Sequence, residues 1–192
     1  SYHNLNKEEK APVLVKRLQE GQSVALVSDA GTPVLSDPGA LLIAQALQAG
    51  IRVVPVPGPS AVLAAIAVSG LPCEAFTFAG VVPSRTGPRR RLLEVLEQER
   101  RTLVFFVPSD RLKTTLETIA AVLGNRRLLL AKDLTKPSEE LLRGTVAKML
   151  KTVAARPLDG EVTLVVGGYR GRERKQATGK GRQARRPRAS GS

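Results

Sequence analysis

The sequence has one cysteine, one histidine and no tryptophan among its 192 residues. A lone Cys73 cannot form a disulfide within the chain, and no Cys-x-x-Cys metal site is present. His3 alone cannot build a histidine-based zinc site or a catalytic triad. The longest apolar run, residues 61–68, is far shorter than the roughly 20 residues of a membrane-crossing helix, and no signal-peptide pattern opens the sequence. We therefore expect a cytoplasmic protein with no metal and no membrane segment.

Aromatic residues are also scarce, at 3% of the chain, whereas positive charge is abundant, with a net charge of +13. This charge is uneven: residues 170–192 hold nine Lys or Arg against Glu173, so this end carries +8 and the other 169 residues carry +5. The same end is rich in Gly, Arg, Pro, Ser and Gln and has too few apolar residues to form a core. We predict a disordered basic tail over residues 169–192. Two interpretations stay open, a solubilising or vector-like extension and an arm that binds polyanions nonspecifically.

Two loops rich in glycine and proline follow the first two apolar, strand-like runs. Residues 28–39 read SDAGTPVLSDPG, and residues 55–61 read PVPGPSA. Each loop lies between a predicted strand (23–28 and 51–54) and a predicted helix (39–49 and 59–69). Glycine permits backbone angles that a β-carbon forbids, and proline fixes the turns. Such loops at the carboxyl ends of neighbouring strands can form one wall of a ligand pocket.

The alternation of helices and strands continues along the chain. The pattern predicts helices at 7–20, 89–98, 109–123 and 145–155, and strands at 76–78, 102–107, 127–131 and 161–166, with a polar segment at 132–144. This alternation predicts an α/β protein with largely parallel strands. We divide it into an N-terminal α/β domain at 1–78, a hinge at 79–88, a C-terminal α/β domain at 89–168 and the tail.

The loops match neither of two common nucleotide-binding motifs. No Gly-Lys-Ser/Thr follows the glycines, as a P-loop requires, and no Gly-x-Gly-x-x-Gly pattern is present. Small residues after strands suit a ligand that contacts the main chain closely, such as an adenosine group. Asp29 could bind a ribose hydroxyl or an amino group, although the residue pattern alone favours a role for Asp29 and Asp37 in stabilising tight turns through their own side chains.

Five segments together carry a resemblance to a known family. They are SDAGTPVLSDPG, VVPVPGPSA, FTFAGVVPSRTGPRRRLL, TLVFFVPSDRL and KDLTKPSEELLRGT, in this order. The chain, from its first residue to about Gly168, resembles the S-adenosylmethionine-dependent methyltransferases of the tetrapyrrole methylase superfamily. Within it, the chain is most similar to the ribosomal RNA small-subunit methyltransferase I group. The resemblance implies methylation of a cytidine ribose 2′-hydroxyl in small-subunit ribosomal RNA or in the 30S subunit, and a homodimer.

The same resemblance implies a fold and a cofactor site. The fold has two α/β domains, each with a mostly parallel or mixed sheet and flanking helices, and S-adenosylmethionine binds in the cleft between them. The residues that correspond to the cofactor site, with Asp29 added from its own chemistry, are Asp29, Ala30, Gly31, Thr32, Leu35, Ser60 and Ala61 from the first domain, and Phe106, Val107 and Leu134 from the second. Core packing is the alternative explanation for the apolar residues among them.

The sequence departs from the family pattern at four places. The resemblance implies a first strand with a Pro-Ile-Gly-Asn-Leu-like loop before Ser1, which predicts that this chain lacks one wall of the cofactor pocket. Leu5 stands where a histidine is usual, and Val107 and Asp110 replace Glu and His. Residues 157–160 (PLDG) replace Arg-Lys-Gly. Each change removes a polar or charged group near the expected RNA side.

Candidates for catalysis and RNA binding follow from the chemistry. A ribose hydroxyl is barely ionised at neutral pH, so a cation must stabilise the developing negative charge and a carboxylate can accept the proton. We single out Lys136 and Glu139, with Glu140 and Arg111; a solvated helix entry is the alternative. A second set, Arg85, Arg89, Arg90 and Arg91, opens a predicted helix, where positive charge opposes the helix dipole and favours an RNA phosphate partner. A solvated loop between domains would also explain these arginines.

Two further functions are compatible with the sequence. A tetrapyrrole methylase would share the loops but not the arginine cluster. A truncated, non-catalytic RNA-binding paralogue would explain the absent strand and the lost polar residues.

Overall fold

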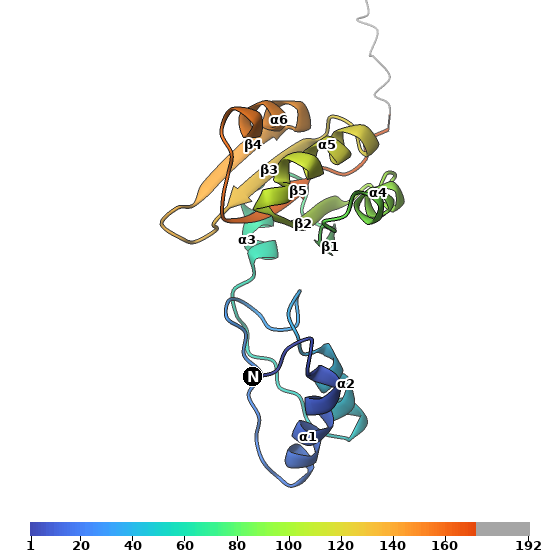
Figure 1. Cartoon of the computed structure of the whole chain (residues 1–192), viewed down its shortest axis with the longest axis vertical. Helices are drawn as coiled ribbons and strands as arrows, with labels where there is room; N and C mark the ends of the chain where they lie inside the picture. Colours follow the sequence, from blue (N-terminus) through green and yellow to red (C-terminus); the bar gives the residue numbers. More distant parts are fainter. Residues whose placement is uncertain (172–192) are drawn as a thin grey trace, which may run out of the picture.

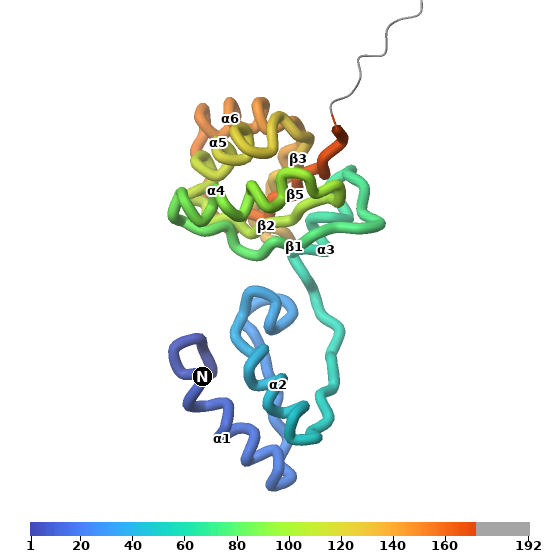
Figure 2. The backbone as a smooth tube through the Cα atoms, turned by 90° about the vertical axis from the view of Figure 1, so that its right-hand side faces the viewer, coloured from blue at the N-terminus to red at the C-terminus, as the bar shows by residue number. Residues whose placement is uncertain are grey.

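The computed structural model describes residues 1–171, so the predicted tail from residue 172 onward lies outside the described residues. Figure 1 shows two lobes: a smaller one with helices α1 and α2, and a larger one with a β-sheet covered by helices. The chain passes between them through the extended segment that precedes α3 (Figure 2). Along residues 1–171, every helix falls short of the length or the apolar content that a bilayer crossing demands.

The smaller lobe is held together by two helices. Helix α1 (Lys7–Gln19) packs against α2 (Ala40–Gln48), with Ala11, Leu42 and Ala46 buried between and around them. Both helices lie where the apolar periodicity predicted them. Glycines follow them at positions 21 and 50 with positive φ angles, as expected for helix ends.

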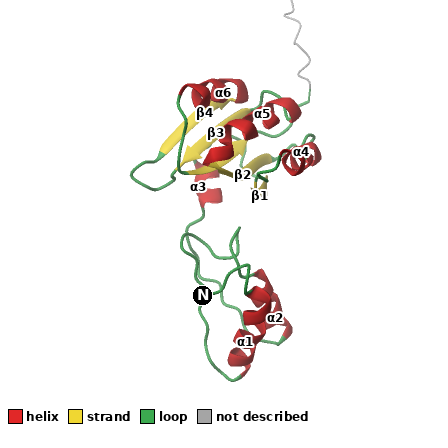
Figure 3. Cartoon of the chain, in the orientation of Figure 1, coloured by secondary structure: helices red, strands yellow, loops and turns green. Residues whose placement is uncertain are grey.

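The two strands predicted in this lobe are not formed. Residues 23–28 and 51–54 are extended but belong to no β-ladder, and strands occur only from residue 76 onward in the described chain (Figure 3). Both segments line a cavity of about 980 Å³ together with side chains of α2. A strand is stable only when a neighbour pairs with its N–H and C=O groups, and neither segment has such a neighbour. Consequently Val27 and Val54 are 80% and 62% exposed.

The larger lobe contains a mixed five-stranded sheet. Its strands are β1 (Phe76–Val81), β2 (Thr102–Pro108), β3 (Arg127–Lys132), β4 (Glu140–Thr145) and β5 (Glu161–Val166), in the order β1-β2-β5-β3-β4. Strands β1 and β2 are parallel, and the other pairs are antiparallel. The α/β class with a mixed sheet is confirmed, but the largely parallel arrangement that the alternation predicted is wrong, because β1 and β2 are the one parallel pair in this sheet. Strand β4 lies in the segment that we predicted as polar and without an element.

Helices cover both faces of this sheet because strand side chains alternate between faces. On one face lie α4 (Thr86–Val95), α5 (Leu112–Val122) and α6 (Val146–Ala155), whose apolar residues pack on Leu103, Phe105 and Leu130. A short 3₁₀ turn (Ser109–Arg111) precedes α5. On the other face lies α3 (Ala61–Ala67), which packs on Val104 and Leu129.

The predicted hinge at 79–88 is not an open linker. Its first residues complete β1, which ends at Val81, and its last residues lie in α4, which begins at Thr86. The sheet also crosses the predicted boundary at residue 78, since β1 pairs with β2 and α3 packs on the sheet. Glycine and proline in this segment therefore mark a tight strand-to-helix turn.

Candidate active site

The strand register brings the candidate residues of the larger lobe to one edge of the sheet. Val81 at the end of β1 pairs with Phe106, and Pro108 at the end of β2 pairs with Glu161 at the start of β5. Lys132 at the end of β3 pairs with Val162 and with Glu140 at the start of β4. The loops at this edge carry Arg85, Arg111, Leu134, Lys136 and Glu139. Candidates spread over more than fifty residues of sequence thus share one rim.

The two glycine- and proline-rich loops of the smaller lobe are joined directly. The N–H and the Oγ1 of Thr32 both donate to the carbonyl oxygen of Pro59, each at 3.0 Å. Gly31 has φ +72°, and a Cβ there would lie 3.2 Å from the same oxygen, so glycine allows the close approach. The loops that we expected to share one wall are therefore in contact.

The first loop has an unusual backbone. The Oγ of Ser28 donates to the carbonyl of Gly31 at 2.8 Å. Val34 and Ser36 have φ angles of 75° and 68°, which side chains bearing a β-carbon rarely adopt. Leu35 lies exposed between them, and Asp29 and Ala30 are also exposed. Strained loop residues of this kind occur in ligand clamps, where the surrounding structure holds them.

The apolar candidates of the larger lobe share the sheet face that carries α3. Phe106 packs edge-to-face on Phe78 with ring centroids 5.0 Å apart, and both rings are half-buried. Leu134 packs against the same apolar cluster as Phe106. Ser60 and Ala61 stand at the start of α3, directly after Pro59. The joined loops therefore lead into the helix that lies on the Phe106 and Leu134 face.

The prediction that the Val107 side chain lines the cofactor site is wrong. Its side chain is 3% exposed and packs in the core beneath α4–α6, on the face opposite Phe106. Adjacent strand residues point to opposite faces, so Phe106 and Val107 cannot both present side chains to one site. Only the main chain of Val107 is available to a ligand on the α3 face.

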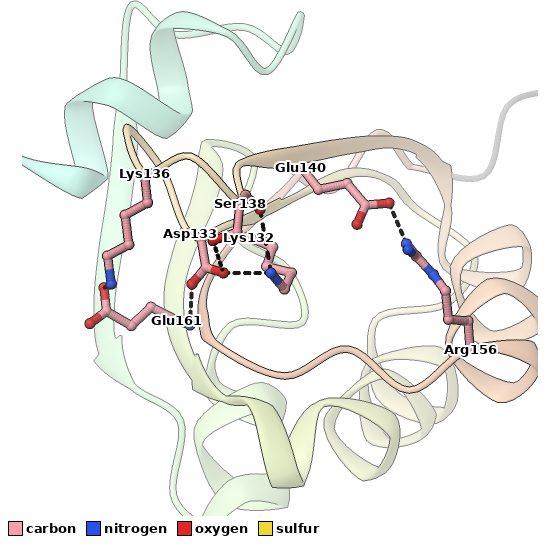
Figure 4. Close-up of polar contacts among 7 residues, drawn as sticks. All are labelled: Lys132, Asp133, Lys136, Ser138, Glu140, Arg156 and Glu161. Atoms are coloured by element: carbon pink, nitrogen blue, oxygen red, sulfur yellow. Dashed lines mark hydrogen bonds and ion pairs between the residues drawn. The ribbon is translucent and has the colours of Figure 1, made fainter.

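Of the four catalytic candidates, Glu140 is half-buried and paired with Arg156, whereas Lys136, Glu139 and Arg111 are exposed. Each of these three also has a partner. Lys136 Nζ lies 3.0 Å from a carboxylate oxygen of Glu161 (Figure 4). Glu139 accepts the N–H of Thr135 at 2.7 Å, and Arg111 pairs with Asp110 at 2.9 Å. Solvent-exposed pairs of this kind contribute little stability and exchange partners easily. All three side chains therefore remain accessible to a substrate at the rim.

The most highly connected group at this rim is Asp133, which the sequence analysis passed over. Its carboxylate accepts Lys132 Nζ at 2.5 Å, Ser138 Oγ at 2.9 Å and the N–H of Glu161 at 3.0 Å (Figure 4). The hydrogen bond from Lys132, followed by those from Glu161 and Ser138, holds the pKa of Asp133 well below its usual range. An aspartate directly after a buried strand and beside a lysine is the sequence signal that could have indicated it.

The structure also corrects the arginine cluster. Arg89 is 4% exposed, and its guanidinium donates to Thr118 Oγ1 at 3.1 Å and to the carbonyl of Ser84 at 3.0 Å. These internal partners leave it unavailable to phosphate. Arg85, Arg90 and Arg91 are exposed, with Arg90 paired to Glu94 at 2.8 Å. Across residues 1–171, no group of three or more His, Cys, Asp or Glu side chains is arranged to hold a metal ion.

The fold defines the class of protein first. The cobalamin biosynthetic enzyme cobalt precorrin-4 methyltransferase, CbiF, superposes with a TM-score of 0.60 over 83% of this chain and 70% of its own, at 21% identity. Uroporphyrin-III C-methyltransferase from Thermus thermophilus, solved with S-adenyl homocysteine, gives 0.55 over 86% and 75%, at 18% identity. These likenesses show the tetrapyrrole-methyltransferase fold.

The sequence comparisons then give the family. The family model of Tetrapyrrole (Corrin/Porphyrin) Methylases matches residues 1–150, and the chain belongs to this family. It is 43% identical over 174 residues to ribosomal RNA small subunit methyltransferase I of Escherichia coli O157:H7, covering 89% of this chain and 61% of that protein. The protein of the same name from Thermotoga maritima is 41% identical over 168 residues, covering 88% and 75%. The chain thus spans about three-fifths of the Escherichia coli relative.

Proposed function

We propose that this chain binds S-adenosylmethionine and transfers its methyl group to a ribose 2′-hydroxyl of a cytidine in small-subunit ribosomal RNA. The observation that carries the proposal is the single rim formed by the ends of β1, β2 and β3, on which the catalytic candidates lie together with Phe106 and Leu134. The identity of 41% and 43% to ribosomal RNA small subunit methyltransferase I proteins supports ribosomal RNA as the substrate.

The residues present fit an adenosyl cofactor. Adenosine offers a flat apolar ring and a polar edge, and it binds best where apolar side chains lie beside free main-chain groups. Half-buried Phe106 and Leu134 supply the apolar surface. The joined loops at Gly31, Thr32 and Pro59 supply closely approaching main chain. When bound, S-adenosylmethionine supplies an electrophilic methyl group on a positively charged sulfur.

The side chains at the rim supply the remaining chemistry. A ribose hydroxyl must lose its proton as it is methylated, so a nearby carboxylate can accept the proton and a cation can stabilise the oxygen. Glu139 and Lys136 stand on the same loop in these two roles, and Arg111 stands on the neighbouring loop after β2. The ammonium group of Lys136 can leave the exposed Glu161 for the substrate oxygen.

The RNA contact is assigned to the first turns of α4. Arg85, Arg90 and Arg91 are exposed there, and the first turn of α4 contains no acidic residue. Positive charge at a helix N-terminus is unfavourable, and RNA phosphate relieves it. The proposal takes the 30S subunit as substrate, a homodimer as the assembly and the cytoplasm as the location.

The test is methyl transfer from tritiated S-adenosylmethionine to 30S subunits that lack the modification, with a porphyrinoid as the competing substrate. The proposal expects label in the RNA and none in the porphyrinoid. Label in the porphyrinoid alone would favour a tetrapyrrole methylase. RNA binding without any transfer would favour a non-catalytic paralogue.

A further inference from the structure

We propose that Asp133 is a positioning residue that locks the β3–β4 loop, residues 133–139, to the start of β5 and thereby fixes Leu134 in the wall of the cofactor site. This inference rests on the proposed function, because it assigns the wall to S-adenosylmethionine. It adds a residue that touches neither the cofactor nor the RNA.

Asp133 continues the β3–β5 ladder by one further step. The last paired residues are Lys132 and Val162. Beyond them, the N–H of Asp133 donates to the carbonyl of Glu161 at 2.8 Å, and the N–H of Glu161 donates back to Asp133 Oδ1 at 3.0 Å. The Asp133 side chain thus accepts the N–H of Glu161 in place of a backbone carbonyl, at the point where the backbone after β3 turns away from β5. Its other oxygen holds Ser138, at the far end of the same loop.

Gly160 makes room for this carboxylate. It has φ +113°, and a Cβ built there would lie 2.5 Å from Asp133 Oδ1 and 2.7 Å from Oδ2. Any other residue would push the carboxylate away or distort the turn before β5. Asp133 and Gly160 therefore form a matched pair that the antiparallel register brings together.

The lock sets the backbone on both sides of Leu134. Asp133 and Thr135 have φ angles of 48° and 66°, so Leu134 is flanked by two left-handed residues. Such conformations are energetically unfavourable for residues with a β-carbon and persist only where other contacts impose them. Asp133 is 7% exposed and makes those contacts. Without them the loop should relax, and Leu134 should leave the cluster that contains Phe106.

The experiment compares four single variants of the 192-residue chain and the double variant D133N/G160A. D133N keeps the shape and removes the charge, G160A inserts a methyl group into the carboxylate's space, and S138A removes one donor as a milder change. The matched control is E94Q, because Glu94 is also an ion-paired carboxylate but lies on α4, outside the β3–β4 loop, where it pairs with Arg90 at 2.8 Å. S-adenosylmethionine affinity is measured by titration calorimetry below the melting temperature of every variant, and loop opening by amide hydrogen exchange.

We expect D133N and G160A each to raise the Kd for S-adenosylmethionine about tenfold or more, from the loss of charge-assisted hydrogen bonds. The double variant should bind S-adenosylmethionine no more weakly than either single variant, because both substitutions remove the same contacts of the Asp133 carboxylate. S138A should have a smaller effect, and E94Q should stay within about twofold of the parent chain. Where transfer is measured, KM for the cofactor should rise with kcat at saturation unchanged.

Several results would overturn this assignment. They are wild-type affinity in D133N, equal weakening in E94Q, or lower melting temperatures with unchanged affinity. If the parent chain itself does not bind S-adenosylmethionine, the proposed function fails and the role of Leu134 fails with it. Hydrogen exchange then still tests whether Asp133 holds the β3–β4 loop against β5. The amides of Thr135 and Glu161 should exchange faster in D133N and G160A, and unchanged exchange would refute this role of Asp133.

Discussion

Arg89 is a buried residue within a run of arginines whose charge suggested that all of them lie on the surface. Four arginines among seven residues suggested one phosphate-binding cluster, but Arg89 points inward and ties α4 to α5 through Thr118. A charge run cannot reveal which of its members faces the core, because that depends on the helix phase against the sheet. The three exposed arginines keep their proposed role.

Replacing Arg89 should therefore destabilise the protein. R89M should lower the free energy of unfolding by about 2–4 kcal/mol, because it removes the hydrogen bonds from the buried Arg89 guanidinium to Ser84 and Thr118. R90M is the matched control and should change it by less than about 0.5 kcal/mol, since the Arg90–Glu94 pair is exposed. Urea denaturation measures both. Equal effects of the two substitutions would contradict the structural role.

Lys136 tests the proposed chemistry at the rim. K136A should slow single-turnover methyl transfer by about tenfold or more while leaving the melting temperature unchanged, because its ion pair with Glu161 is exposed. E161Q removes the partner and serves as the control. If K136A transfers methyl groups at the parent rate, Lys136 has no part in catalysis.

Glu99 predicts a pH dependence of stability. Hydrogen bonds from the Arg101 side chain and backbone lower the pKa of Glu99 to about 2. Because the folded-state pKa lies below the unfolded value, the ionised carboxylate stabilises the fold above the unfolded pKa, and this contribution is lost as the pH falls toward about 2. The free energy of unfolding should therefore decrease between about pH 5 and pH 2. This part of the decrease should be absent in E99Q, and an identical pH profile for E99Q would contradict the assignment.

At the scale of elements, periodicity located the helices and most strands but not their pairing. Residues 23–28 have the composition of a strand and are extended, yet they have no ladder, since pairing depends on a neighbour elsewhere in the chain. Strand β4 was missed for the opposite reason. Its sequence, ELLRGT, is half polar because it is an edge strand, and pairing with β3 defines it.

The sequence could indicate single residues of the candidate site, but not the contacts that bring them together. The family motifs indicated Thr32, Phe106 and Leu134 one by one. The contact from Thr32 to Pro59 and the match of Asp133 with Gly160 each join residues 27 apart in sequence. Such contacts follow from the fold and the strand register, which the local sequence does not encode.

The start of α4 predicts the salt dependence of RNA binding. R85A/R91A should reduce the slope of log K against log salt by about two, one for each lost phosphate contact, if the exposed arginines bind phosphate. K148A/K151A removes the same charge from α6, which α5 separates from α4, and should leave the slope near that of the parent chain. Filter binding to ribosomal RNA over a range of salt concentrations measures both. Equal slopes for the two double variants would contradict a phosphate site on α4.

At the scale of the whole molecule, the two lobes present different kinds of surface to the proposed site. The smaller lobe offers glycine-lined main chain, and the larger lobe offers an apolar sheet face with charged loops at its rim. Helix α3 links these surfaces, since it follows the second loop and packs on the sheet. In the proposed function, the methyl donor and the RNA acceptor bind at these two linked surfaces.

The most direct test of this account is to identify the methylated nucleoside. The chain is incubated with 30S subunits and S-adenosylmethionine carrying a deuterated methyl group, and the ribosomal RNA is digested to nucleosides for mass spectrometry. The account predicts the deuterated methyl group on the ribose of cytidine. Deuterium on a base, or in no nucleoside although the cofactor and the RNA both bind, would contradict it.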